Sequence, residues 1–478
     1  MDHINKEKLL YIGIDIGTTA TKAVCFDIHG NVINQISHSY PMYHPKPDWS
    51  IQKPQEILET VLKCIQEITK DIQPQFISFS SAMQSIIAID ETGKPLTEAI
   101  LWADNRANEI AEKIKNSEKG KFFYQKSGIP IHPFSPMTKI VWLKEFDSEI
   151  FSKTYKFISI KEYVWHHLTG EYATDSSMAS GTGLLNIHTL KWDDEILEFL
   201  KINPQQLSEI HQVTHQCKGI LDDFLYVIGG GDGALANLGT GAMNKSFMAL
   251  TIGTSGAVRL PIDQPFVDPQ MRTQCYHLKD SQYLTLGAVN NGAIVLQWLK
   301  EAILKTSASY EELFDEAEKI AAGSEGLLFV PYLLGERAPI WDASAQGSLL
   351  GMQIIHTQAH LVRATLEGIL FGLFQITEIL LPDAEKRKET TIMASGGFGK
   401  SEFWLQIVAD IFQMKVETSQ TIEGSAWGAV LIGLDATGIA VENQHKTGKT
   451  YLPNPANKKV YNDSFTKFKK VYSLLKGL

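Results

Sequence analysis

The sequence predicts an α/β protein made of two domains of similar size, and three observations support this. The chain has 478 residues, of which 44% are hydrophobic, whereas a single core rarely grows beyond about 250 to 300 residues. A short strand-turn-strand pattern occurs twice, almost half the chain apart. Segments with the two-residue period of strands are followed by segments with the longer period of helices.

The repeated pattern links residues 10–24 (LYIGIDIGTTATKAV) to residues 249–259 (ALTIGTSGAVR). Each copy contains an apolar strand, the turn Ile-Gly-Thr followed by Thr or Ser, and a return into β-branched residues. No Pro/Gly/Ser-rich linker or low-complexity segment divides the chain. We therefore expect one domain over residues 1–239 and a second over residues 240–478.

Alternation in the first copy predicts a half-buried strand with isoleucines on the core face. Asp15 then lies on the face that points away from the core. The Gly-Thr-Thr that follows predicts a tight turn, and residues 21–27 predict the returning strand. Apolar residues at helical spacing predict amphipathic helices over residues 55–70, 360–379 and 401–412.

The composition excludes several classes of protein. Basic residues number 44 and acidic residues 54, a net charge of −10, so no basic surface is expected for a nucleic acid. No apolar run reaches the roughly 20 residues that cross a bilayer, and the charged start MDHINKEKLL does not resemble a signal peptide. The four cysteines form no C-x-x-C pair and indicate reduced thiols. We expect a cytoplasmic protein that binds neither nucleic acid nor membrane.

The turn within residues 15–22 (DIGTTATK) suits the terminal phosphates of a nucleotide. Gly17 lets the backbone approach closely, and backbone N–H groups with the hydroxyls of Thr18 and Thr19 can donate to phosphate oxygens. By itself the segment is equally a plain glycine hairpin. The second copy, which contains Thr254, favours two hairpins that clamp one phosphate chain, so that Thr18 and Thr254 contact the same nucleotide.

Two charged residues border this turn. Lys22 adds a positive charge near the phosphates, and Asp15 offers the oxygens that Mg²⁺ or its water shell requires. No G-K-[ST] sequence follows a glycine run near a strand end, so a P-loop is not expected.

Asp232 is the candidate catalytic residue. It follows three glycines at the end of the apolar strand predicted over residues 225–228, which presents a carboxylate at the mouth of the strand with close access for substrate. In phosphoryl transfer one positioned carboxylate suffices to accept the proton of the attacking hydroxyl. The alternative is that Asp232 caps a helix beginning at Gly233, and the two roles are compatible.

Residues 393–406 (MASGGFGKSEFWLQ) predict a strand end, a glycine turn and the start of a helix. The first N–H groups of such a helix attract an anion or the ribose of a nucleotide. Gly397 would give access to the backbone and Ser401 a polar contact. The pattern itself is common, and it gains weight from its position in the second half.

Taken together, these motifs resemble the FGGY family of carbohydrate kinases, over nearly the whole chain. In the order of the family they are DIGTTATK (15–22), FSPMTKIVWLKE (134–145), GGGDGA (229–234), TIGTSG (251–256), PYLLGERAPIWD (331–342), RATLEG (363–368) and SGGFGKSEFW (395–404). The resemblance implies two ribonuclease-H-like domains of the actin-like ATPase type, with ATP, magnesium and the sugar in the cleft between them. It also leaves a homodimer open.

The resemblance implies roles for single residues. Asp232 matches the catalytic base of the family. The phosphate and magnesium loop matches Asp15, Thr18 and Thr19, with magnesium held by Asp15 through water. The ADP contacts of the second domain match Thr254, Gly292, Gln297, Gly397 and Ser401. The last of these stands where glycerol kinases have Asn.

Substrate choice is expected from the first domain, where residues 81–85 (SAMQS) and 101–107 (LWADNRA) occupy the sugar-contact positions of the family. Met83 and Gln84 replace the Arg-Glu pair of glycerol kinases, which argues against glycerol. With HPFSP and GERAPIWD these segments are most similar to gluconate kinases, because xylulokinases commonly have Asn where Ala103 stands. The expected substrate contacts are Met83, Gln84, Asp104, Arg106, His132 and Phe134.

Gluconate is a linear polyol with a carboxylate, so its site needs hydroxyl acceptors and at least one cation. Asp104 suits the first need. The candidate cations are Arg106, His132, Lys139 and Arg337. Each has a structural alternative: an ion pair for the two arginines, a loop position for His132, and a solvated helix face for Lys139.

Other functions compete with this prediction. A xylulokinase or another pentulose or polyol kinase differs only in the sugar-contact residues. Chaperone and filament ATPases of the actin-like type hydrolyse ATP without phosphorylating a small molecule, and Asp232 after the glycines argues against them. A pure binding module is disfavoured because the phosphate turn and Asp232 are both intact.

Overall fold

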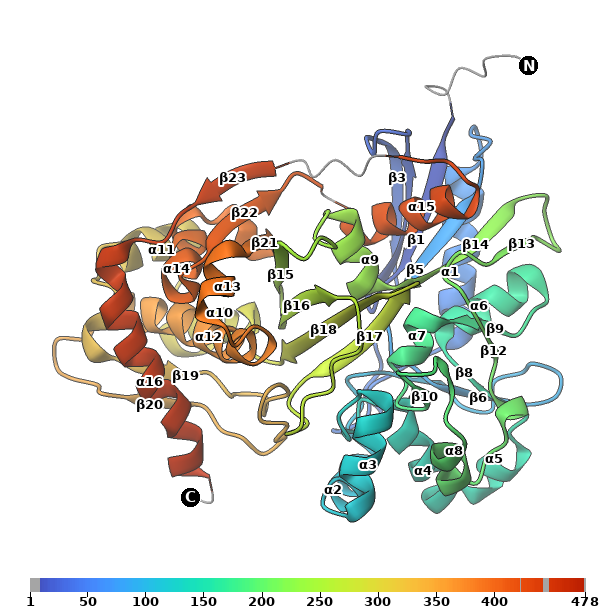
Figure 1. Cartoon of the computed structure of the whole chain (residues 1–478), viewed down its shortest axis with the longest axis horizontal. Coiled ribbons are helices and arrows are strands. Elements are labelled where there is room, and N and C mark those ends of the chain that lie inside the picture. The colour runs from blue at the N-terminus through green and yellow to red at the C-terminus, as the bar shows by residue number, and fades with distance from the viewer. Residues whose placement is uncertain (1–8, 422, 442–446, 477–478) are drawn as a thin grey trace. The chain divides into compact units, whose positions relative to one another are not determined.

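The computed structural model describes residues 9–421, 423–441 and 447–476 (Figure 1). The chain forms two compact units. The first takes the described residues of Met1–Gly241, Ile262–Leu284 and Thr421–Gln444, and the second takes those of Ala242–Pro261, Thr285–Gln420 and His445–Leu478. The chain first passes from one unit to the other after Gly241, close to the expected boundary. Two segments of the second half, however, belong to the first unit.

The first unit is built on a six-stranded sheet. The strands lie in the order β13 (Gln216–Lys218), β14 (Leu225–Gly231), β5 (Ile77–Ser81), β1 (Tyr11–Ile16), β2 (Ala20–Phe26) and β3 (Val32–Ser39). Strands β14, β5 and β1 are parallel, and β1 and β2 form the predicted antiparallel hairpin. Because parallel strands end at one edge of a sheet, the residues after β1, β5 and β14 lie along that edge.

Helices cover both faces of this sheet. Helix α1 (Pro54–Ile68) shares the core of the β1 isoleucines, and α15 (Gly424–Ala436) packs on β1, β5 and α9 (Asp232–Gly239). The prediction that β1 is half-buried is therefore wrong. A Cβ atom on Gly13 would lie 2.1 Å from the carbonyl oxygen of Ala426, so only glycine allows this close approach.

Many of the remaining elements of the first unit share a hydrophobic core separate from that of the sheet. Its other helices are α2 (Asn108–Lys115), α3 (Glu118–Ser127), α4 (Pro136–Phe146), α5 (Ser148–Lys153), α6 (Ile160–Thr169), α7 (Ser176–Ser180) and α8 (Asp194–Leu200). Its short strands pair as β4 (Ile51–Gln52) with β7 (Ala99–Ile100), β6 (Ile87–Ile89) with β8 (Lys156–Ile158), β9 (Ala173–Asp175) with β12 (Glu209–His211), and β10 (Leu185–Asn186) with β11 (Lys191–Trp192). Strand β17 (Gln274–Lys279) also belongs to this unit and contacts α7.

The second unit has a sheet with the order β18 (Gln282–Val289), β16 (Gly256–Ile262), β15 (Phe247–Ile252), β21 (Thr391–Ser395), β22 (Lys415–Ser419) and β23 (Thr447–Tyr451). Strands β15 and β16 form the second predicted hairpin, and β15, β21 and β22 are parallel. The two units thus repeat one strand arrangement, as the internal repeat predicted.

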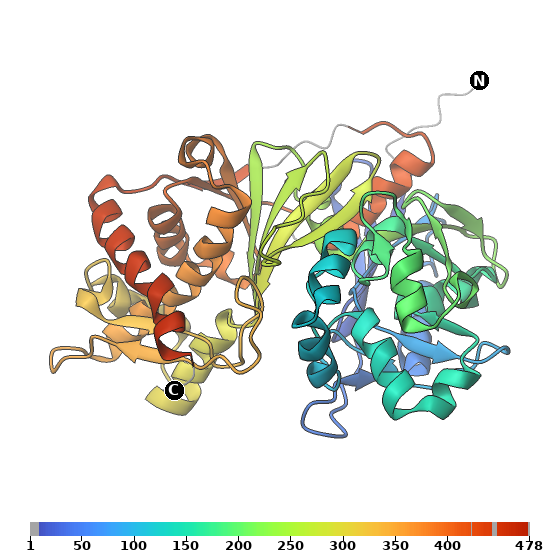
Figure 2. The ribbon, with the colours of Figure 1, turned by 60° about the horizontal axis from the view of Figure 1, so that its bottom comes forward.

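Helices of the second unit are α10 (Ala293–Trp298), α11 (Tyr310–Glu318), α12 (Gln358–Leu380), α13 (Ala384–Glu389), α14 (Glu402–Phe412) and α16 (Lys458–Leu475), with a π-helix over Leu299–Leu304. Strands β19 (Leu328–Val330) and β20 (Ser348–Leu350) form a separate pair. Figure 2 shows α16 in red, alongside the other helices of its unit. The three helices expected from sequence, now α1, α12 and α14, are confirmed to within two residues at each end.

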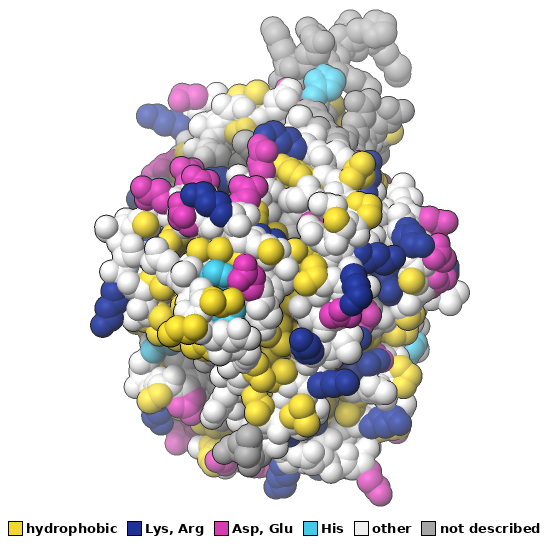
Figure 3. All heavy atoms as spheres, turned by 90° about the vertical axis from the view of Figure 1, so that its left-hand side faces the viewer, with side chains coloured by type: hydrophobic (Ala, Val, Ile, Leu, Met, Phe, Trp, Pro, Cys, Tyr) yellow, Lys and Arg dark blue, Asp and Glu magenta, His cyan; other side chains and the backbone are white. Residues whose placement is uncertain are grey.

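One surface of the second unit is unusually apolar. The segment that starts in β20 exposes Leu349, Met352, Ile354 and Ile355. This segment lies at the left of Figure 1, and hydrophobic side chains gather on the face that Figure 3 turns toward the viewer. Scattered exposed apolar residues are normal, whereas several in one short segment are not.

Candidate functional site

The edge of the first sheet brings together segments that are far apart in sequence. Ile16 of β1 and Gly231 of β14 both pair with Ser81 at the end of β5. The phosphate turn, the residues after Ser81 and the start of α9 therefore follow one another along this edge. Polar groups at the carboxyl ends of parallel strands are the usual site of ligands in α/β sheets.

Asp232 begins helix α9, and the residue in the capping position is Gly231. The alternative that Asp232 caps a helix beginning at Gly233 is therefore wrong by one residue, because the helix begins at Asp232 itself. One oxygen, Oδ1, accepts a hydrogen bond from the Gly233 N–H at 2.7 Å, and the residue is only partly buried. A carboxylate in the first turn of a helix is stabilised in its charged form by the helix dipole.

The glycines before Asp232 are required by packing. Gly229 has φ +64°, and a Cβ atom there would lie 1.8 Å from the carbonyl oxygen of Phe79 in β5. A Cβ atom on Gly231 would lie 2.6 Å from the sulfur of Met83. Gly229 and Gly231 therefore make room for protein atoms, and Met83 lies against the start of α9. Close approach of a substrate to this backbone stays a prediction.

The phosphate turn is held by its own backbone and by side chains from two other segments. The Gly17 N–H donates to the Ala20 carbonyl oxygen at 3.0 Å, which closes the turn. Thr18 accepts on its hydroxyl oxygen from the Trp102 indole N–H at 3.2 Å, and its carbonyl oxygen accepts from the Gln52 side chain at 2.7 Å. Thr19 is exposed at the tip. The turn is therefore fixed against the loop that carries Trp102.

Asp15 and Lys22 occupy neighbouring strands at the base of the turn. The Ser80 hydroxyl donates to Asp15 Oδ1 at 2.7 Å. Burial raises the pKa of Asp15, although Ser80 and Lys22 act in the opposite direction. Lys22 forms an ion pair with Glu423 at 2.8 Å. Lys22 is thus already paired within the first unit.

The residues present are compatible with a magnesium ion bound mainly by phosphate and water. Asp15 offers a carboxylate of the kind that Mg²⁺ prefers. Among the residues that the structure describes, no group of three or more His, Cys, Asp or Glu side chains could hold a metal by itself. Asp15 would therefore share such an ion with phosphate oxygens.

The segment after β5 carries Met83 and Gln84. Met83 is buried, and Gln84 has φ +69°, the left-handed region that few residues other than glycine adopt. The Gln84 side-chain amide donates to the Tyr276 hydroxyl at 2.6 Å, which in turn donates to Gln274 at 2.9 Å. Tyr276 and Gln274 come from β17, and no sequence pattern predicted this contact.

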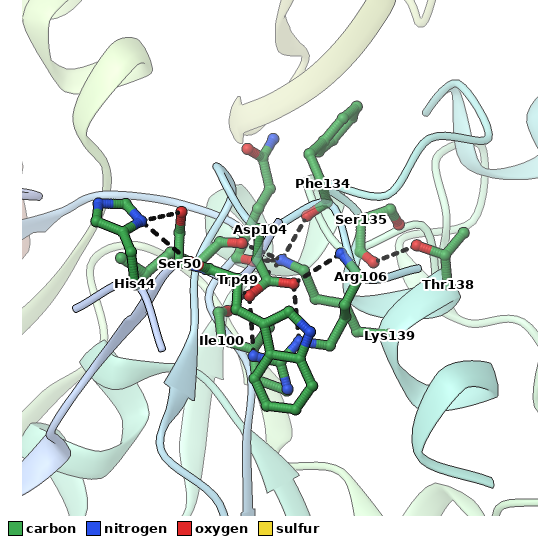
Figure 4. Close-up of polar contacts among 12 residues, drawn as sticks. His44, Trp49, Ser50, Ile100, Asp104, Arg106, Phe134, Ser135, Thr138 and Lys139 are labelled. Carbon is green, nitrogen blue, oxygen red and sulfur yellow. Dashed lines mark hydrogen bonds and ion pairs between the residues drawn. The ribbon is translucent and has the colours of Figure 1, made fainter. Parts of the chain in front are cut away.

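Asp104 and Arg106 form a closed ion pair (Figure 4). Asp104 is 0% exposed and accepts from the Ser50 N–H, the Arg106 N–H and two guanidinium N–H groups at 2.7 to 3.0 Å. The Arg106 guanidinium lies over the Trp49 ring, 3.5 Å from its centroid. These contacts agree with the alternative that Arg106 forms a structural ion pair. A direct contact of Asp104 or Arg106 with the sugar stays a prediction.

Lys139 of α4 is 0% exposed, so the alternative of a solvated helix charge is wrong. Its ammonium group donates to the carbonyl oxygens of Gln84, Leu101 and Phe134 at 2.7 to 2.9 Å. A fourth carbonyl oxygen, that of Ile100, lies at 3.5 Å. Lys139 therefore holds together the segments that carry the expected substrate contacts.

His132 and Phe134 lie just before α4. Phe134 is buried and its N–H donates to His132 Nδ1 at 3.2 Å. The two rings lie 5.2 Å apart. Because Nδ1 accepts, the proton of a neutral His132 ring is on Nε2. Arg337 belongs to the second unit, where it donates to the Val289 carbonyl oxygen at 3.1 Å.

The second unit contains a cavity of ≈ 570 Å³. Four of the residues expected to bind ADP line it, which are Thr254, Gln297, Gly397 and Ser401. Gly292 does not line the cavity but precedes α10, and its N–H donates to the Thr254 carbonyl oxygen at 3.2 Å. The structure thus brings together residues that lie more than a hundred positions apart.

Aromatic side chains form much of the wall of this cavity, and sequence reasoning missed them. They are Tyr310, Phe314, Phe398, Phe403 and Trp404. The first two lie one turn apart on α11, a spacing that sequence alone does not separate from an ordinary core face. Ser401 caps α14 by accepting from the Trp404 N–H at 3.2 Å. A flat aromatic base with a ribose suits such a cavity.

Gly397→Val tests whether this cavity binds the nucleotide. A Cβ atom at Gly397 meets no atom within 4 Å, so the larger side chain should fill the cavity without disturbing the fold. We expect KM for ATP to rise about ten-fold while the melting temperature stays close to that of the wild type. Gly399→Val is the matched control, because Gly399 is equally open but does not line the cavity. An unchanged KM for ATP in Gly397→Val would place the nucleotide elsewhere.

Comparison with known proteins agrees with this geometry. The profile "FGGY family of carbohydrate kinases, N-terminal domain" matches residues 10–239, and the profile of the C-terminal domain matches residues 248–436. The chain belongs to the FGGY family of carbohydrate kinases. The expected two-domain α/β kinase fold is confirmed, and membership implies ATP as the phosphoryl donor.

Several relatives of this FGGY kinase are similar over most of its length. It is 42% identical over 449 residues to a gluconokinase of Bacillus subtilis, which covers 89% of this chain and 87% of that protein. Two solved structures from Lactobacillus acidophilus, titled as a gluconate kinase and as a ligand-bound xylulose kinase, each align with a TM-score of 0.94. Each is 37% identical and covers 98% of both chains.

The described helices include none that is long and apolar enough to cross a membrane.

Thr18 and Thr254 belong to different units. Their expected contact with one phosphate chain therefore stays a prediction.

Proposed function

We propose that this FGGY kinase transfers the terminal phosphoryl group of magnesium-ATP to the terminal primary hydroxyl of D-gluconate. The products are 6-phosphogluconate and ADP. The similarity to a gluconokinase, 42% identity over about nine tenths of each chain, carries this proposal. The sugar-contact segments WADNRA, HPFSP and GERAPIWD support it.

In the proposed reaction Asp232 accepts the proton of the attacking hydroxyl group. Its position supports this role, because it lies partly exposed at the carboxyl edge of the first sheet beside the segment of Met83 and Gln84. A general base must lie within hydrogen-bond reach of the proton that it accepts. The phosphoryl group then bonds to the sugar oxygen as its bond to the ADP oxygen breaks.

We propose that the aromatic cavity of the second unit binds the adenosine part of ATP, with polar contacts from Gln297, Ser401 and the Gly397 backbone. The Thr18 and Thr19 turn would bind phosphate oxygens, and Asp15 would take part in holding magnesium. Magnesium, when bound, neutralises charge on the transferring phosphoryl group. A cytoplasmic location and a homodimer stay predictions from the sequence.

A pentulose kinase is the second candidate, because one of the two Lactobacillus acidophilus structures is titled as a xylulose kinase. A polar site built on Gln84 and the Asp104 loop also suits a ketopentose. The actin-like chaperone and filament ATPases are no longer competitors, since the chain belongs to a carbohydrate kinase family.

The deciding experiment compares kcat/KM for gluconate, xylulose, ribulose, glycerol and erythritol with magnesium-ATP. We expect gluconate to have the highest value and the product to carry phosphate on its terminal carbon, as phosphorus NMR would show. A charge-assisted contact to the carboxylate contributes about 1.5 to 3 kcal/mol, roughly ten-fold or more in KM. A higher value for xylulose would overturn gluconate and leave the family intact.

A further inference from the structure

Lys139 makes an unusual set of contacts for a lysine. It is fully buried, yet its ammonium group pairs with no carboxylate among the described contacts. An ammonium group has three N–H donors, and three carbonyl oxygens lie at 2.7 to 2.9 Å from Nζ. Each donor therefore has its own acceptor (Figure 4).

The three acceptors come from three separate segments of the first unit. The carbonyl of Gln84 belongs to the segment after β5, that of Leu101 precedes Trp102, and that of Phe134 lies just before α4. Trp102 in turn donates to Thr18 of the phosphate turn. One charged group thus links the three segments of the first unit that carry the expected substrate contacts.

These contacts also argue against a direct contact between Lys139 and a substrate carboxylate. All three donors are already directed to protein carbonyl groups, and the side chain is 0% exposed. Leaving a buried carbonyl group without a donor costs more free energy than an ordinary hydrogen bond contributes. A substrate would have to displace one of these contacts to reach the ammonium group.

We propose that Lys139 is a positioning residue: it sets the sugar-binding segments in place for any polyol substrate without contacting the substrate itself. This inference rests on the proposed sugar kinase function and assigns a role within the same site. It predicts that Lys139 affects gluconate and neutral polyols equally. A cation that binds the carboxylate would instead affect gluconate alone.

The contacts of Lys139 should also depend on pH, because the number of N–H donors on its amine changes with protonation. Burial lowers the pKa of Lys139 to about 7, with Asp104 raising it and Arg106 lowering it. The His132 ring, next to Phe134, is a further titratable group nearby. A neutral amine has two N–H donors for three carbonyls, so the segments should loosen as the pH rises above this pKa.

The test compares Lys139→Met with Lys144→Met. Lys144 is the matched control because it lies on the same helix, α4, and its ammonium group contacts a single carbonyl oxygen, that of Phe199 at 3.5 Å. We expect Lys139→Met to raise KM for gluconate and for xylulose or erythritol by the same factor, about ten-fold or more, with a smaller effect on KM for ATP. For a polyol that is not phosphorylated, its inhibition constant against gluconate replaces KM. Lys144→Met should behave as the wild type.

A loss confined to gluconate would overturn the proposal and identify Lys139 as the carboxylate contact. Unchanged constants for every polyol would also overturn it. If Lys139→Met does not fold, Lys139→Gln, which keeps two N–H donors, provides the same comparison. It should raise the constants for gluconate and for the neutral polyol by the same factor, and unequal factors would contradict the proposal. If no polyol is phosphorylated by the wild type, the proposed function itself fails.

Discussion

Asp232→Asn is expected to lower kcat for sugar phosphorylation by about 10² to 10⁴-fold. Asparagine has the size and shape of aspartate, and its side-chain oxygen can still accept from the Gly233 N–H as Asp232 does at 2.7 Å. It cannot take up the proton of the sugar hydroxyl at neutral pH. The substitution therefore removes the base with little change in the start of α9.

Steady-state kinetics, ATP binding by calorimetry and thermal unfolding would separate the possible causes of such a loss. Asp194→Asn is the matched control, because Asp194 is likewise the first residue of a helix, α8, but is exposed away from the sheet edge. We expect ATP affinity and melting temperature to be nearly unchanged in both variants. A folded Asp232→Asn enzyme with wild-type kcat would remove Asp232 from the mechanism.

Asp15→Asn is expected to reduce kcat about 10²-fold at ordinary magnesium concentrations, with partial recovery as magnesium is raised. The carboxylate accepts from Ser80 at 2.7 Å, a contact that asparagine can keep through its own oxygen, so the strand should be undisturbed. Loss of the negative charge weakens attraction for the cation. The measurement is kcat as a function of magnesium concentration, and titration with a chelator should abolish activity of the wild type.

The pKa of Asp15 adds a second test of the same residue. Because burial raises this pKa, the charged form is lost at a higher pH than for an ordinary aspartate as the pH falls. Activity of the wild type at limiting magnesium should therefore decline on the acid side, and Asp15→Asn should lack this decline. Asp27→Asn, at a half-buried position just after β2, is the control. Equal magnesium dependence in Asp15→Asn and the wild type would exclude a role for Asp15 in binding the ion.

The sequence by itself determined the local elements and the order of the motifs. The two hairpins follow from apolar strands interrupted by Ile-Gly-Thr turns, and the helices from 3.6-residue periodicity, which depend on residues close together in the chain. Asp232 could be placed at a strand end because three glycines follow an apolar run. The nucleotide residues Gln297, Gly397 and Ser401 were found through the motifs of the family, and the structure gathers them around one cavity.

Only the tertiary structure decided what surrounds these elements. Helix α15 returns from the end of the chain to cover the face of β1 that alternation assigned to the outside, because a buried parallel sheet needs a helix on each face. Nothing near Gly13 in the sequence encodes that contact. The division of the chain into units changed for the same reason, since long-range packing and not sequence order defines a compact unit.

The roles of single charged residues also depended on the tertiary structure. A lysine on an apolar helix has the same sequence signal whether it faces water or, as Lys139 does, three carbonyl oxygens from distant loops. The contacts of Asp104 could not be read from the sequence either: three of its hydrogen-bond donors belong to Arg106, two residues away, and a fourth is the backbone N–H of Ser50. Periodicity records which residues are apolar, whereas the partner of a buried charge is set by chain segments that meet only after folding.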